Sequence, residues 1–547
     1  MKTFAYGEFM YTKSRVCMAA LAAVTGVGIA ATALTDGAAA THARVTGGEV
    51  EGSLDHGVIA FKGIPFAAAS TGANRWRAPQ PVAPWSGVRS ATAYGPDCMQ
   101  IPFPGDAAPL GVPPKEDCLY ANVWKPAVGG RKLPVMVWIY GGGFVNGGSS
   151  PPVYDGSAFA RDGIVLVSFN YRLGNFGFYA HPALSAEQKG QPLGNYAYLD
   201  QVAALRWVKQ NVAAFGGDPD NVTIFGESAG GMSVHALLLN PLARGLFQKA
   251  IIESGGGAAG LGSRPVSGGS ESAEAKGLAL AAQFGVHGED AAALTQLRAI
   301  PADKLVDGLN MGSMGKGNYV GGPIQDGTYE SGSPVVGYAH GKAARVPVMI
   351  GANTMDIGFM QARTLDELYA QFGPDAVAAR KAYAFPEGTP VGLAAFQAGG
   401  DQMMVEPARR TAQILTARGQ PVYEYRFSYV AESLRAKTPG APHATEIPFV
   451  FDTVAARYGK DLTQADEAAA RAMHAYWVAF ARTGKPAAQG LPEWPAYDAR
   501  QDVIMNFTNS GPVAQPDPWK ARLDVAQRFS ARAVVAARAA QDKGGSK

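Results

Sequence analysis

Short runs of consecutive apolar residues alternate along this chain with longer segments that have helical spacing. Buried strands are predicted over residues 132–140, 163–170, 222–225, 249–254 and 346–350. A helix is predicted over residues 199–211, where apolar side chains partly share one face. Strands that alternate with helices are typical of an α/β fold, with a large, mostly parallel central sheet and helices on both faces. Functional side chains in such a sheet lie beyond the carboxyl ends of the strands.

The segments outside this alternation indicate how the chain is organised. Residues 257–322 are poor in strand patterns and rich in Ala, Gly and Leu, so we expect a helical insertion over the sheet. Residues 521–540 mix apolar residues with Arg and Gln and predict a C-terminal surface helix, followed by a disordered tail at 541–547. No internal repeat or long polar linker is present. Residues 44–540 are therefore predicted to form a single domain.

Residues 1–43 have the order of an export signal. Three basic residues among the first fifteen precede an apolar stretch at 16–34, and small residues suited to cleavage follow. The alternative is a membrane anchor, but Ala, Gly, Val and Thr dominate the stretch and partition weakly into lipid. We expect a secreted or periplasmic protein with no stable membrane span, whose mature chain starts near Thr41 or Arg44.

Composition narrows the classes of partner. The 547 residues carry a formal charge of only +3, and no Lys/Arg cluster is interleaved with aromatic residues. Nucleic-acid binding is therefore not expected, and the sequence gives no indication of oligomeric state.

Two cysteines remain once the predicted signal is removed, Cys98 and Cys118. An even number of cysteines in an oxidising compartment favours a disulfide between them, and two free buried thiols are the alternative. A zinc site is not expected, because two cysteines without nearby histidines do not complete a tetrahedral set of ligands.

The segment VTIFGESAGG, residues 222–231, carries the strongest chemical indication. A β-branched apolar run ends in Gly-x-Ser-x-Gly, the pattern of a strand that turns sharply into a helix with a serine at its tip. The helix directs its N-terminal dipole toward that serine. Ser228 is therefore the candidate nucleophile, and a Gly/Ser turn without chemistry is the alternative.

A glycine run supplies candidate donors for an oxyanion. Residues 141–143 directly follow a predicted strand, and consecutive glycines allow main-chain N–H groups to approach a substrate. Together with the N–H that follows the nucleophile, this run predicts an oxyanion hole made by Gly142, Gly143 and Ala229. A flexible glycine turn would be preferred if no Gly-x-Ser-x-Gly segment followed.

The base and the acid are predicted from chain order, which in this architecture runs serine, acid, histidine. His443 lies in a late loop and is the candidate base, whereas Asp356 follows a predicted strand and is the first choice for the acid. Asp326 is the second choice, because its Asp-Gly context suggests a turn. The other histidines are assigned elsewhere: His42 near the signal, His56, His181, His287 and His340 in surface turns or loops, His235 facing away along the helix, and His474 in a packing helix.

With these residues in view, the chain resembles the type B carboxylesterase/cholinesterase family of α/β hydrolases, from about Val45 to Trp519. The resemblance rests on ordered motifs at residues 61–67 (FKGIPFA), 116–120 (EDCLY), 170–174 (NYRLG), 194–195 (GN), 199–201 (LDQ), 215–219 (FGGDP) and 226–231 (GESAGG). It implies an α/β-hydrolase fold, Ser228 as nucleophile, His443 as base, an acid at Asp356 and a Cys98–Cys118 disulfide. Ser254 resembles a family serine that supports the acid.

Three positions depart from the family pattern. Asp356 stands where the family usually has Glu, so the acid is one methylene shorter. Residues 68–70 (AAS) replace the usual Pro-Pro near the mouth of the site. The segment between the two cysteines contains no Trp, and cholinesterases place a cation-binding Trp there, so choline esters are disfavoured.

Together these features predict a serine carboxylesterase that acts on a small-molecule ester through an acyl-enzyme and needs no cofactor and no metal. A lipase or a carbamate or amide hydrolase on the same fold is the alternative. A non-catalytic cholinesterase-like binding protein is a further, less favoured alternative, because every catalytic group is present. Phe144, Phe103 and Trp76 are candidates for the entrance, and Arg75 and Arg77 are interpreted as a solvated basic pair.

Overall fold

The computed structural model describes residues 41–257, 264–314, 321–327 and 333–544. The predicted export signal therefore lies outside the described residues as far as residue 40. The next residues belong to strand β1 (His42–Val45), which pairs with β2 (Gly48–Glu51) and, through it, with β5 (Val88–Ser90) in a small separate sheet. Residues 42 and 43, assigned by the sequence to the signal, thus have partners in the folded protein.

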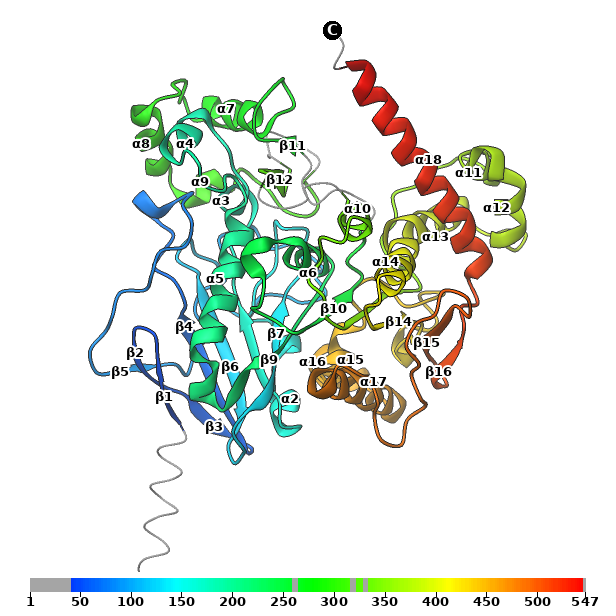
Figure 1. Ribbon diagram of the computed structural model, residues 1–547, viewed down its shortest axis with the longest axis horizontal. Coiled ribbons are helices and arrows are strands. Elements are labelled where there is room, and N and C mark those ends of the chain that lie inside the picture. The colour runs from blue at the N-terminus through cyan, green and yellow to red at the C-terminus, as the bar shows by residue number, and fades with distance from the viewer. Residues whose placement is uncertain (1–40, 258–263, 315–320, 328–332, 545–547) are drawn as a thin grey trace, which may run out of the picture.

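An eleven-stranded sheet forms the centre of the molecule (Figure 1). Its strands, in spatial order, are β16 (Gly511–Pro516), β15 (Val503–Thr508), β14 (Val422–Phe427), β13 (Val348–Asn353), β10 (Lys249–Glu253), β9 (Gly217–Glu227), β7 (Leu133–Ile139), β8 (Val165–Phe169), β6 (Tyr120–Pro126), β4 (Val58–Pro65) and β3 (Ser53–Asp55). From β15 to β8 all neighbours are parallel, whereas β16, β6, β4 and β3 pair antiparallel at the two edges. The prediction of a mostly parallel sheet is therefore confirmed for its middle.

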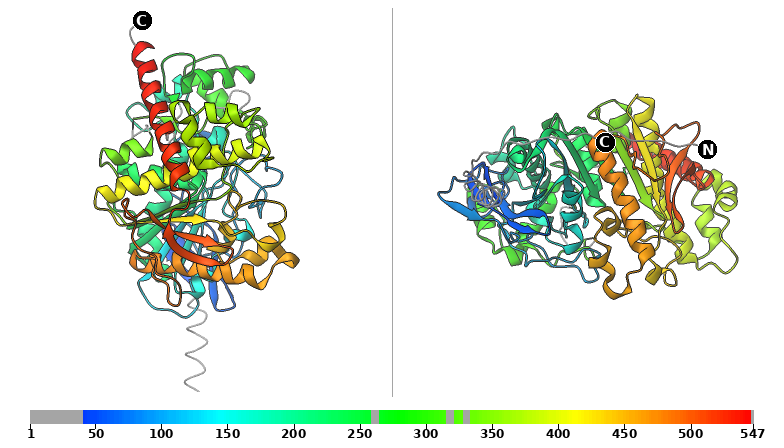
Figure 2. Two further views of the ribbon diagram at one scale, coloured as in Figure 1. Left: turned by 90° about the vertical axis from the view of Figure 1, so that its right-hand side faces the viewer. Right: turned by 90° about the horizontal axis from the view of Figure 1, so that it is seen from below.

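Helices cover both faces of this sheet (Figures 1 and 2). Helices α5 (Tyr196–Asn211), α6 (Ala229–Leu239) and α14 (Glu406–Ala417) pack on one face, and α2 (Ser157–Arg161) and α17 (Gln464–Thr483) pack on the other. Because the middle strands are buried on both sides, they consist of almost continuous apolar residues. Shorter helices connect these layers: α3 (Gly174–Gly177), α4 (Pro182–Glu187), α10 (Pro334–Ala339), α15 (Ile447–Val450) and α16 (Val454–Tyr458).

Two helical regions extend beyond the layered core. The predicted insertion contains α7 (Ala273–Gln283), α8 (Ala291–Ala299), α9 (Ala302–Leu305) and a two-stranded sheet of β11 (Arg264–Pro265) and β12 (Ile324–Gln325). Helices α11 (Leu365–Ala370), α12 (Ala376–Tyr383) and α13 (Val391–Gly400) form the second region, next to a π-helical turn, η6 (Asp401–Val405). Each region has an apolar cluster of its own.

The chain ends in a long helix, α18 (Lys520–Gly544), that projects from the body (Figures 1 and 2). Its first half is fastened to the second helical region, where Arg528 and Arg532 pair with Asp375. The helix continues to Gly544, so the prediction that the disordered tail begins at residue 541 is wrong for the residues up to 544. Residues 545–547 lie outside the described part of the chain.

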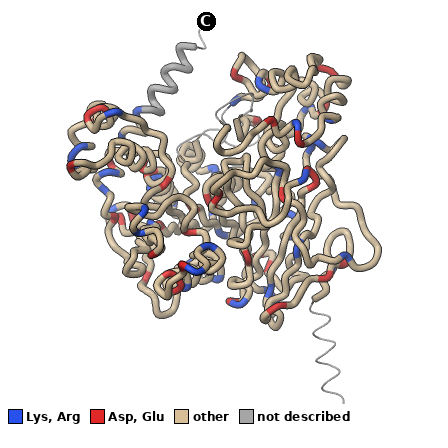
Figure 3. The backbone as a smooth tube through the Cα atoms, turned by 180° about the vertical axis from the view of Figure 1, so that it is seen from behind, with Lys and Arg blue, Asp and Glu red and all other residues tan. Residues whose placement is uncertain are grey.

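Positions of basic and acidic residues are interspersed along the backbone on the side shown in Figure 3.

Some of the ion pairs are buried. Arg75 pairs with Glu116 at 2.5 Å and donates to the carbonyl of Ile300 at 2.6 Å, and its side chain is only 5% exposed. The interpretation of Arg75 as solvated is therefore wrong: the guanidinium fastens the disulfide segment to the helical insertion. Arg77, in contrast, is partly exposed beside Glu187.

A second buried pair fixes the loop after β8 to α5. Arg172 contacts Asp200 through Nη2 at 2.7 Å and through Nε at 2.8 Å, and its main-chain N–H donates to the same carboxylate at 3.0 Å. Both side chains are almost fully buried. Because both side chains are shielded from water, removal of either one would leave the other charge buried without a partner.

We predict that Asp200→Asn destabilises the protein by about 3–5 kcal/mol, because it leaves the Arg172 guanidinium buried without a counter-charge. The measurement is the thermal unfolding midpoint of purified protein. Asp220→Asn, which removes the carboxylate of the exposed Lys209–Asp220 pair, is the matched control and should leave the midpoint nearly unchanged. Equal midpoints for Asp200→Asn and the parent would contradict the structural role given to this pair.

Candidate active site

Ser228 occupies the junction between β9 and α6, where the backbone has an unusual conformation. Its φ of 57° and ψ of −122° lie in a region that residues with a side chain rarely adopt. The main-chain N–H of Ser228 donates to the carbonyl oxygen of Glu253 at 2.9 Å, so the neighbouring strand β10 holds the turn. The predicted strand–serine–helix turn is thus present, with Ser228 at its tip.

The glycines around Ser228 are required by close approach of other segments. A Cβ atom at Gly226 would lie 2.6 Å from the carbonyl oxygen of Ile139, and one at Gly230 would overlap that same oxygen. A Cβ at Gly231 would lie 2.7 Å from the Cα of Gly255. Because real Cβ atoms do not approach so closely, helix α6 can pack onto β7 and β10 only with glycine at these positions.

The predicted acid and base contact each other. Asp356 follows β13 and its Oδ1 lies 2.6 Å from Nδ1 of His443. Its second oxygen, Oδ2, accepts hydrogen bonds from the Ser254 hydroxyl at 2.7 Å and from the main-chain N–H of Asn353 at 3.0 Å. The shorter Asp side chain therefore reaches the imidazole, and Ser254 supports the acid as the family resemblance implied. Asp326, the second choice, follows β12 in the separate two-stranded sheet.

Main-chain contacts bring the acid loop and the histidine loop together. The N–H of Met355 donates to the carbonyl of Ala441 at 2.8 Å, and Met355 and Pro442 pair as an isolated parallel bridge. The side chain of Asn353 donates to the carbonyl of Pro442 at 2.8 Å. The two loops are thus aligned by their backbones, and the Asp356–His443 contact does not depend on the side chains alone.

Electrostatics favour a charged Asp356 beside His443. Burial by itself would raise the pKa of Asp356, but the neighbouring His443 and the donors on both oxygens hold that pKa below the ordinary value. Burial by itself would lower the pKa of His443, yet the charge of Asp356 and the hydrogen bond between them raise it above 6.5 overall. The imidazole side chain remains 17% exposed, so a reactant can reach it.

Ser228 and His443 line one cavity of about 180 Å³. Its wall also includes residues of the disulfide segment and of the helical insertion. The lining residues are Phe103, Gly105, Asp106, Ala107, Ala108, Gly141, Gly142, Gly147, Tyr154, Glu227, Ser228, Met311, His443, Ala444 and Ile447. Of the aromatic residues expected at the entrance, Phe103 lies in this wall, whereas Phe144 packs on Phe178 and Trp76 is buried against Tyr179.

The predicted oxyanion loop passes beside the nucleophile. A Cβ atom at Gly141 would lie 2.9 Å from the Cβ of Ser228. Gly142 has φ 103° and Gly143 has φ 63°, conformations that glycine adopts without strain. Ala229, the third predicted donor, is the first residue of α6. Gly142 lines the cavity together with Ser228, and Ala229 directly follows Ser228 at the helix N-terminus, where negative charge is favoured. The assignment of Gly142, Gly143 and Ala229 as oxyanion donors stays a prediction.

Sequence reasoning missed the carboxyl group of Glu227. Nε2 of His443 lies 3.1 Å from Oε1 of Glu227, so the imidazole stands between two carboxyl groups. Burial, followed by repulsion from Asp356 and Glu253, raises the pKa of Glu227 well above its ordinary value. Of the two carboxyl groups that contact the imidazole, Asp356 is thus the one whose charged form is favoured. The residue stood within the quoted GESAGG segment, but no sequence pattern showed that its side chain turns toward His443.

Two further buried carboxyl groups lie behind the acid and the base. Glu253 accepts a hydrogen bond from the indole N–H of Trp477 at 2.7 Å, and burial raises the pKa of Glu253 to about 8. Glu446 contacts the side-chain amide of Asn353, and burial raises the pKa of Glu446 well above the ordinary value. These groups are expected to be largely neutral near pH 7.

Three other histidines, His181, His235 and His474, make contacts within the fold away from Ser228. His181 is wrongly predicted as a surface residue: it is fully buried, and its Nδ1 accepts the N–H of Ala183 at the start of α4. His235 contacts the hydroxyl of Tyr338 at 2.5 Å, and His474 lies in α17 within 2.7 Å of a main-chain carbonyl. Only His443 among these lines the cavity with Ser228.

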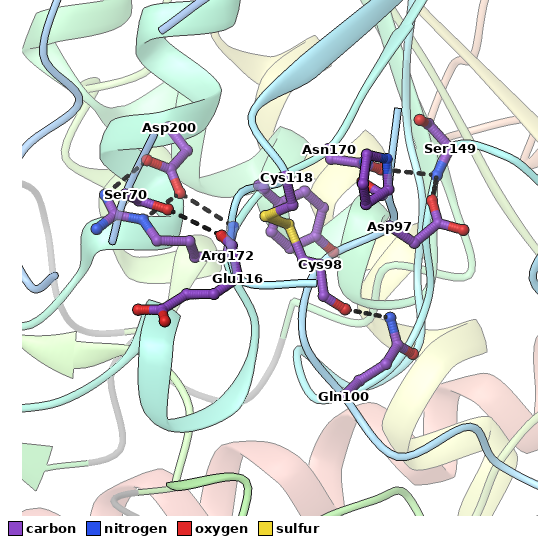
Figure 4. Close-up of a disulfide and its surroundings, with 12 residues drawn as sticks. Ser70, Asp97, Cys98, Gln100, Glu116, Cys118, Ser149, Asn170, Arg172 and Asp200 are labelled. Atoms are coloured by element: carbon purple, nitrogen blue, oxygen red, sulfur yellow. Dashed lines mark hydrogen bonds and ion pairs between the residues drawn. A yellow bond between two sulfur atoms is a disulfide. The ribbon is translucent and has the colours of Figure 1, made fainter. Parts of the chain in front are cut away.

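Cys98 and Cys118 form a disulfide, as predicted (Figure 4). It closes the segment that supplies Phe103 and residues 105–108 to the cavity wall. Within the described ranges, no three His, Cys, Asp or Glu side chains are grouped in a way that could hold a metal ion. Nor does any helix in those ranges combine the length and apolarity needed to cross a bilayer.

Comparison with known proteins places this arrangement in a family. The model of the carboxylesterase family matches residues 38–382 and 391–522. Fumonisin B1 esterase of Sphingopyxis macrogoltabida is 36% identical over 474 residues, which cover 84% of each chain. Para-nitrobenzyl esterase of Bacillus subtilis is 36% identical over 494 residues, covering 85% of this chain and 95% of the relative.

A solved structure shows the same fold. The structure of PNB esterase superposes with a TM-score of 0.75 at 33% identity and covers 89% of this chain and 99% of its own. The extent of these matches assigns the α/β-hydrolase fold and the family. The chain belongs to the carboxylesterase family and is a carboxylic ester hydrolase.

Proposed function

We propose that this protein hydrolyses small-molecule carboxylic esters through a covalent acyl-enzyme on Ser228. The observation that carries the proposal is the chain of hydrogen bonds from Ser254 to Asp356 to His443, which ends in the cavity that Ser228 lines. A histidine oriented by a buried carboxylate and adjoining a serine at a helix N-terminus is the arrangement that activates a hydroxyl for attack on a carbonyl.

In the first half of the reaction, His443 removes the proton from the Ser228 hydroxyl as its oxygen attacks the ester carbonyl. Asp356 fixes the imidazole tautomer and stabilises the imidazolium that forms. The N–H groups of Gly142, Gly143 and Ala229 stabilise the tetrahedral oxyanion. The intermediate then collapses, the bond to the alcohol breaks, and His443 returns the proton to the leaving alkoxide.

In the second half, water attacks the acyl-enzyme by the same route. His443 accepts a proton from water, the hydroxide oxygen adds to the acyl carbonyl, and the oxyanion occupies the same donors. Collapse of this intermediate releases the carboxylic acid, and His443 returns the proton to the oxygen of Ser228. The side chains start and end in the same protonation state, so the cycle needs no other reactant.

The cavity favours compact esters with apolar groups. The described residues enclose about 180 Å³, less than the roughly 300–1,000 Å³ of pockets that surround drug-sized ligands. Phe103, Tyr154, Met311 and Ile447 contribute apolar surface to the wall. The two relatives above are named for different substrates, fumonisin B1 and a para-nitrobenzyl group, at the same 36% identity. Their names therefore do not select a substrate for this chain.

We also propose that the protein is exported, as a secreted or periplasmic enzyme, by cleavage before Thr41. The N–H of Gly52 donates to the carbonyl of Thr41 at 2.8 Å, and β1 pairs with β2 from His42 onward. Cleavage before Arg44 would remove the first half of β1, including the buried Ala43. Thr41 is therefore the better of the two starts that the sequence offers.

We predict that Ser228→Ala lowers kcat/KM for p-nitrophenyl acetate by a factor of about 10⁴ to 10⁶, because no other group can form the acyl-enzyme. The same variant should lose covalent labelling by a fluorophosphonate probe. Ser428→Ala, which removes a hydroxyl bonded to Asn506 at the end of β14, is the control and should keep the parent rate and labelling. Labelling of Ser228→Ala at the parent level would refute the assignment of the nucleophile.

We predict that kcat/KM of the parent rises with pH through an inflection above 6.5, since His443 must be neutral to act as base. In Asp356→Asn the charge and the strong hydrogen bond that raise the pKa of His443 are lost, while burial, which lowers it, remains. The inflection should therefore move to lower pH, and kcat should fall about 10⁴-fold. The measurement is the pH profile of each variant, with Asp326→Asn as a control that keeps the parent profile. An unchanged inflection in Asp356→Asn would show that Asp356 does not orient the base.

We predict that the exported protein begins at Thr41. The full-length chain is expressed in a bacterium with an outer membrane, recovered from the periplasm or medium, and sequenced from its N-terminus. A start at Arg44 would contradict the argument from β1, and recovery of a chain that still begins at Met1 would contradict cleavage.

A further inference from the structure

The loop that carries the proposed oxyanion donors has an unusual backbone conformation. Gly142, Gly143, Phe144 and Gly147 all have φ between 62° and 106°, which places four of six consecutive residues in the left-handed region. Phe144 adopts this conformation in spite of its side chain, at a cost in free energy. The loop begins after the last residue of β7, so it receives no pairing from the sheet. Within the loop, the N–H groups of Val145 and Asn146 donate to the carbonyl of Gly142. Contacts from outside the loop therefore add to its stability, above all at Gly147.

Gln100 supplies such contacts with every hydrogen-bonding group of its side-chain amide. Its Nε2 donates to the carbonyl of Gly147 at 2.6 Å and to the carbonyl of Cys98 at 2.9 Å. Its Oε1 accepts the N–H of Gly147 at 2.9 Å and the side-chain amide of Asn146 at 3.1 Å. The amide thus pairs with both main-chain groups of Gly147, as a neighbouring strand would. The side chain is buried, so water cannot replace it.

Asn146 extends this anchoring to the predicted donor Gly142. The N–H of Asn146 donates to the carbonyl of Gly142 at 2.9 Å, and its own carbonyl packs so closely that a Cβ at Gly142 would overlap it. The side chain of Asn146 donates to the carbonyl of Ile101 at 2.7 Å and accepts the N–H of Met311 at 2.9 Å. A movement of Gln100 would therefore be transmitted through Asn146 to Gly142.

The disulfide anchors the segment from which Gln100 reaches the loop (Figure 4). On the other side of Cys98, Asp97 accepts the N–H of Ser149 at 3.1 Å and contacts the hydroxyl of Ser150. Gln100 and Asp97, on the two sides of Cys98, thus contact Gly147, at the end of the oxyanion loop, and Ser149 and Ser150, which follow it. Cys118 lies two residues before β6, so the disulfide connects these contacts to the central sheet.

We propose that Gln100 is a positioning residue that aims the N–H groups of Gly142 and Gly143 at the developing oxyanion, with the Cys98–Cys118 disulfide as its fixed support. The inference rests on the proposed acyl-enzyme reaction. Oxyanion donors act at 2.7–3.1 Å from the charge that develops, and a displacement of about 1 Å can cost about 100-fold in rate. Loss of Gln100 should therefore weaken transition-state stabilisation more than binding of the substrate.

The test uses Gln100→Met, which keeps the length of the side chain and removes all four hydrogen bonds. We expect kcat for p-nitrophenyl acetate to fall about 10- to 100-fold while KM changes less than about 3-fold. The inhibition constant of a trifluoromethyl ketone, whose adduct with Ser228 carries the oxyanion, should rise by the same factor as kcat falls.

Gln420→Met is the matched control. Gln420 is also buried, and its amide donates to two main-chain carbonyls, of Ala344 and Val346, both at 3.1 Å. These contacts lie away from the residues that line the catalytic cavity. We expect Gln420→Met to lower the unfolding midpoint as Gln100→Met does, but to keep the parent kcat and the parent inhibition constant.

Gln100→Glu keeps the measurement possible if Gln100→Met does not fold. It retains the side-chain length and both accepted hydrogen bonds but loses both donations, to the carbonyls of Gly147 and Cys98. We therefore expect kcat to fall again with little change in KM. Parent values of kcat and inhibition constant in a folded Gln100 variant would overturn the inference, as would an equal loss of kcat in Gln420→Met. If the parent enzyme hydrolyses no ester and Ser228 is not labelled by a fluorophosphonate, the proposed function itself has failed.

Discussion

The close contact of β7, β9 and β10 at the turn around Ser228 is the constraint on which the site depends. The backbone turns there through φ 57°, and helix α6 starts so close to its neighbours that glycine is required on both sides. Because the order β7, β9, β10, β13 is spatially continuous, their carboxyl ends present the oxyanion loop, Ser228, Ser254 and Asp356 side by side. Each catalytic contribution is thus one strand away from the next, and only His443 arrives from a more distant loop.

The same packing determines the charges around the imidazole. Four carboxyl groups, those of Asp356, Glu227, Glu253 and Glu446, are buried within this small region. Only for Asp356 do the imidazole and the hydrogen-bond donors outweigh burial, so that its pKa is lowered. Burial raises the pKa of the other three, and repulsion from neighbouring carboxyl groups adds to this for Glu227 and Glu446. Asp356 is therefore the carboxyl group whose charge is most favoured beside His443. If all four were ionised, the imidazolium would be stabilised so strongly that the histidine could no longer act as a base near neutral pH.

The sequence predicted the parts of this arrangement that depend on local pattern. The turn at Ser228 is encoded in ten consecutive residues, and Asp356 and His443 follow from their position after a strand and in a late loop. It did not predict which polar side chains are buried, since burial depends on partners that are distant in the chain. Arg75 contacts a carbonyl 225 residues away, and Gln100 acts on a loop 47 residues away. Strands β14 and β15 and the antiparallel edge strands were not predicted either. Strand β14, for example, is fully buried although its sequence VYEYRF contains Glu and Arg.

The division between sheet and loops also explains why the reaction can be assigned without its substrate. Ser228 and Asp356, the proposed nucleophile and acid, follow strands of the central sheet, and His443 is aligned with Asp356 by main-chain contacts between their loops. The cavity wall, in contrast, is built from the disulfide segment around Phe103, from the helical insertion through Met311, and from Tyr154 and Ile447. Phe103 and Met311 lie in loops, which can change without disturbing the sheet, whereas Tyr154 packs on Trp138 of β7 and Ile447 begins α15. Equal identity to a fumonisin B1 esterase and to a para-nitrobenzyl esterase therefore does not select a substrate, because relatives that share one fold can differ in the side chains of the cavity wall.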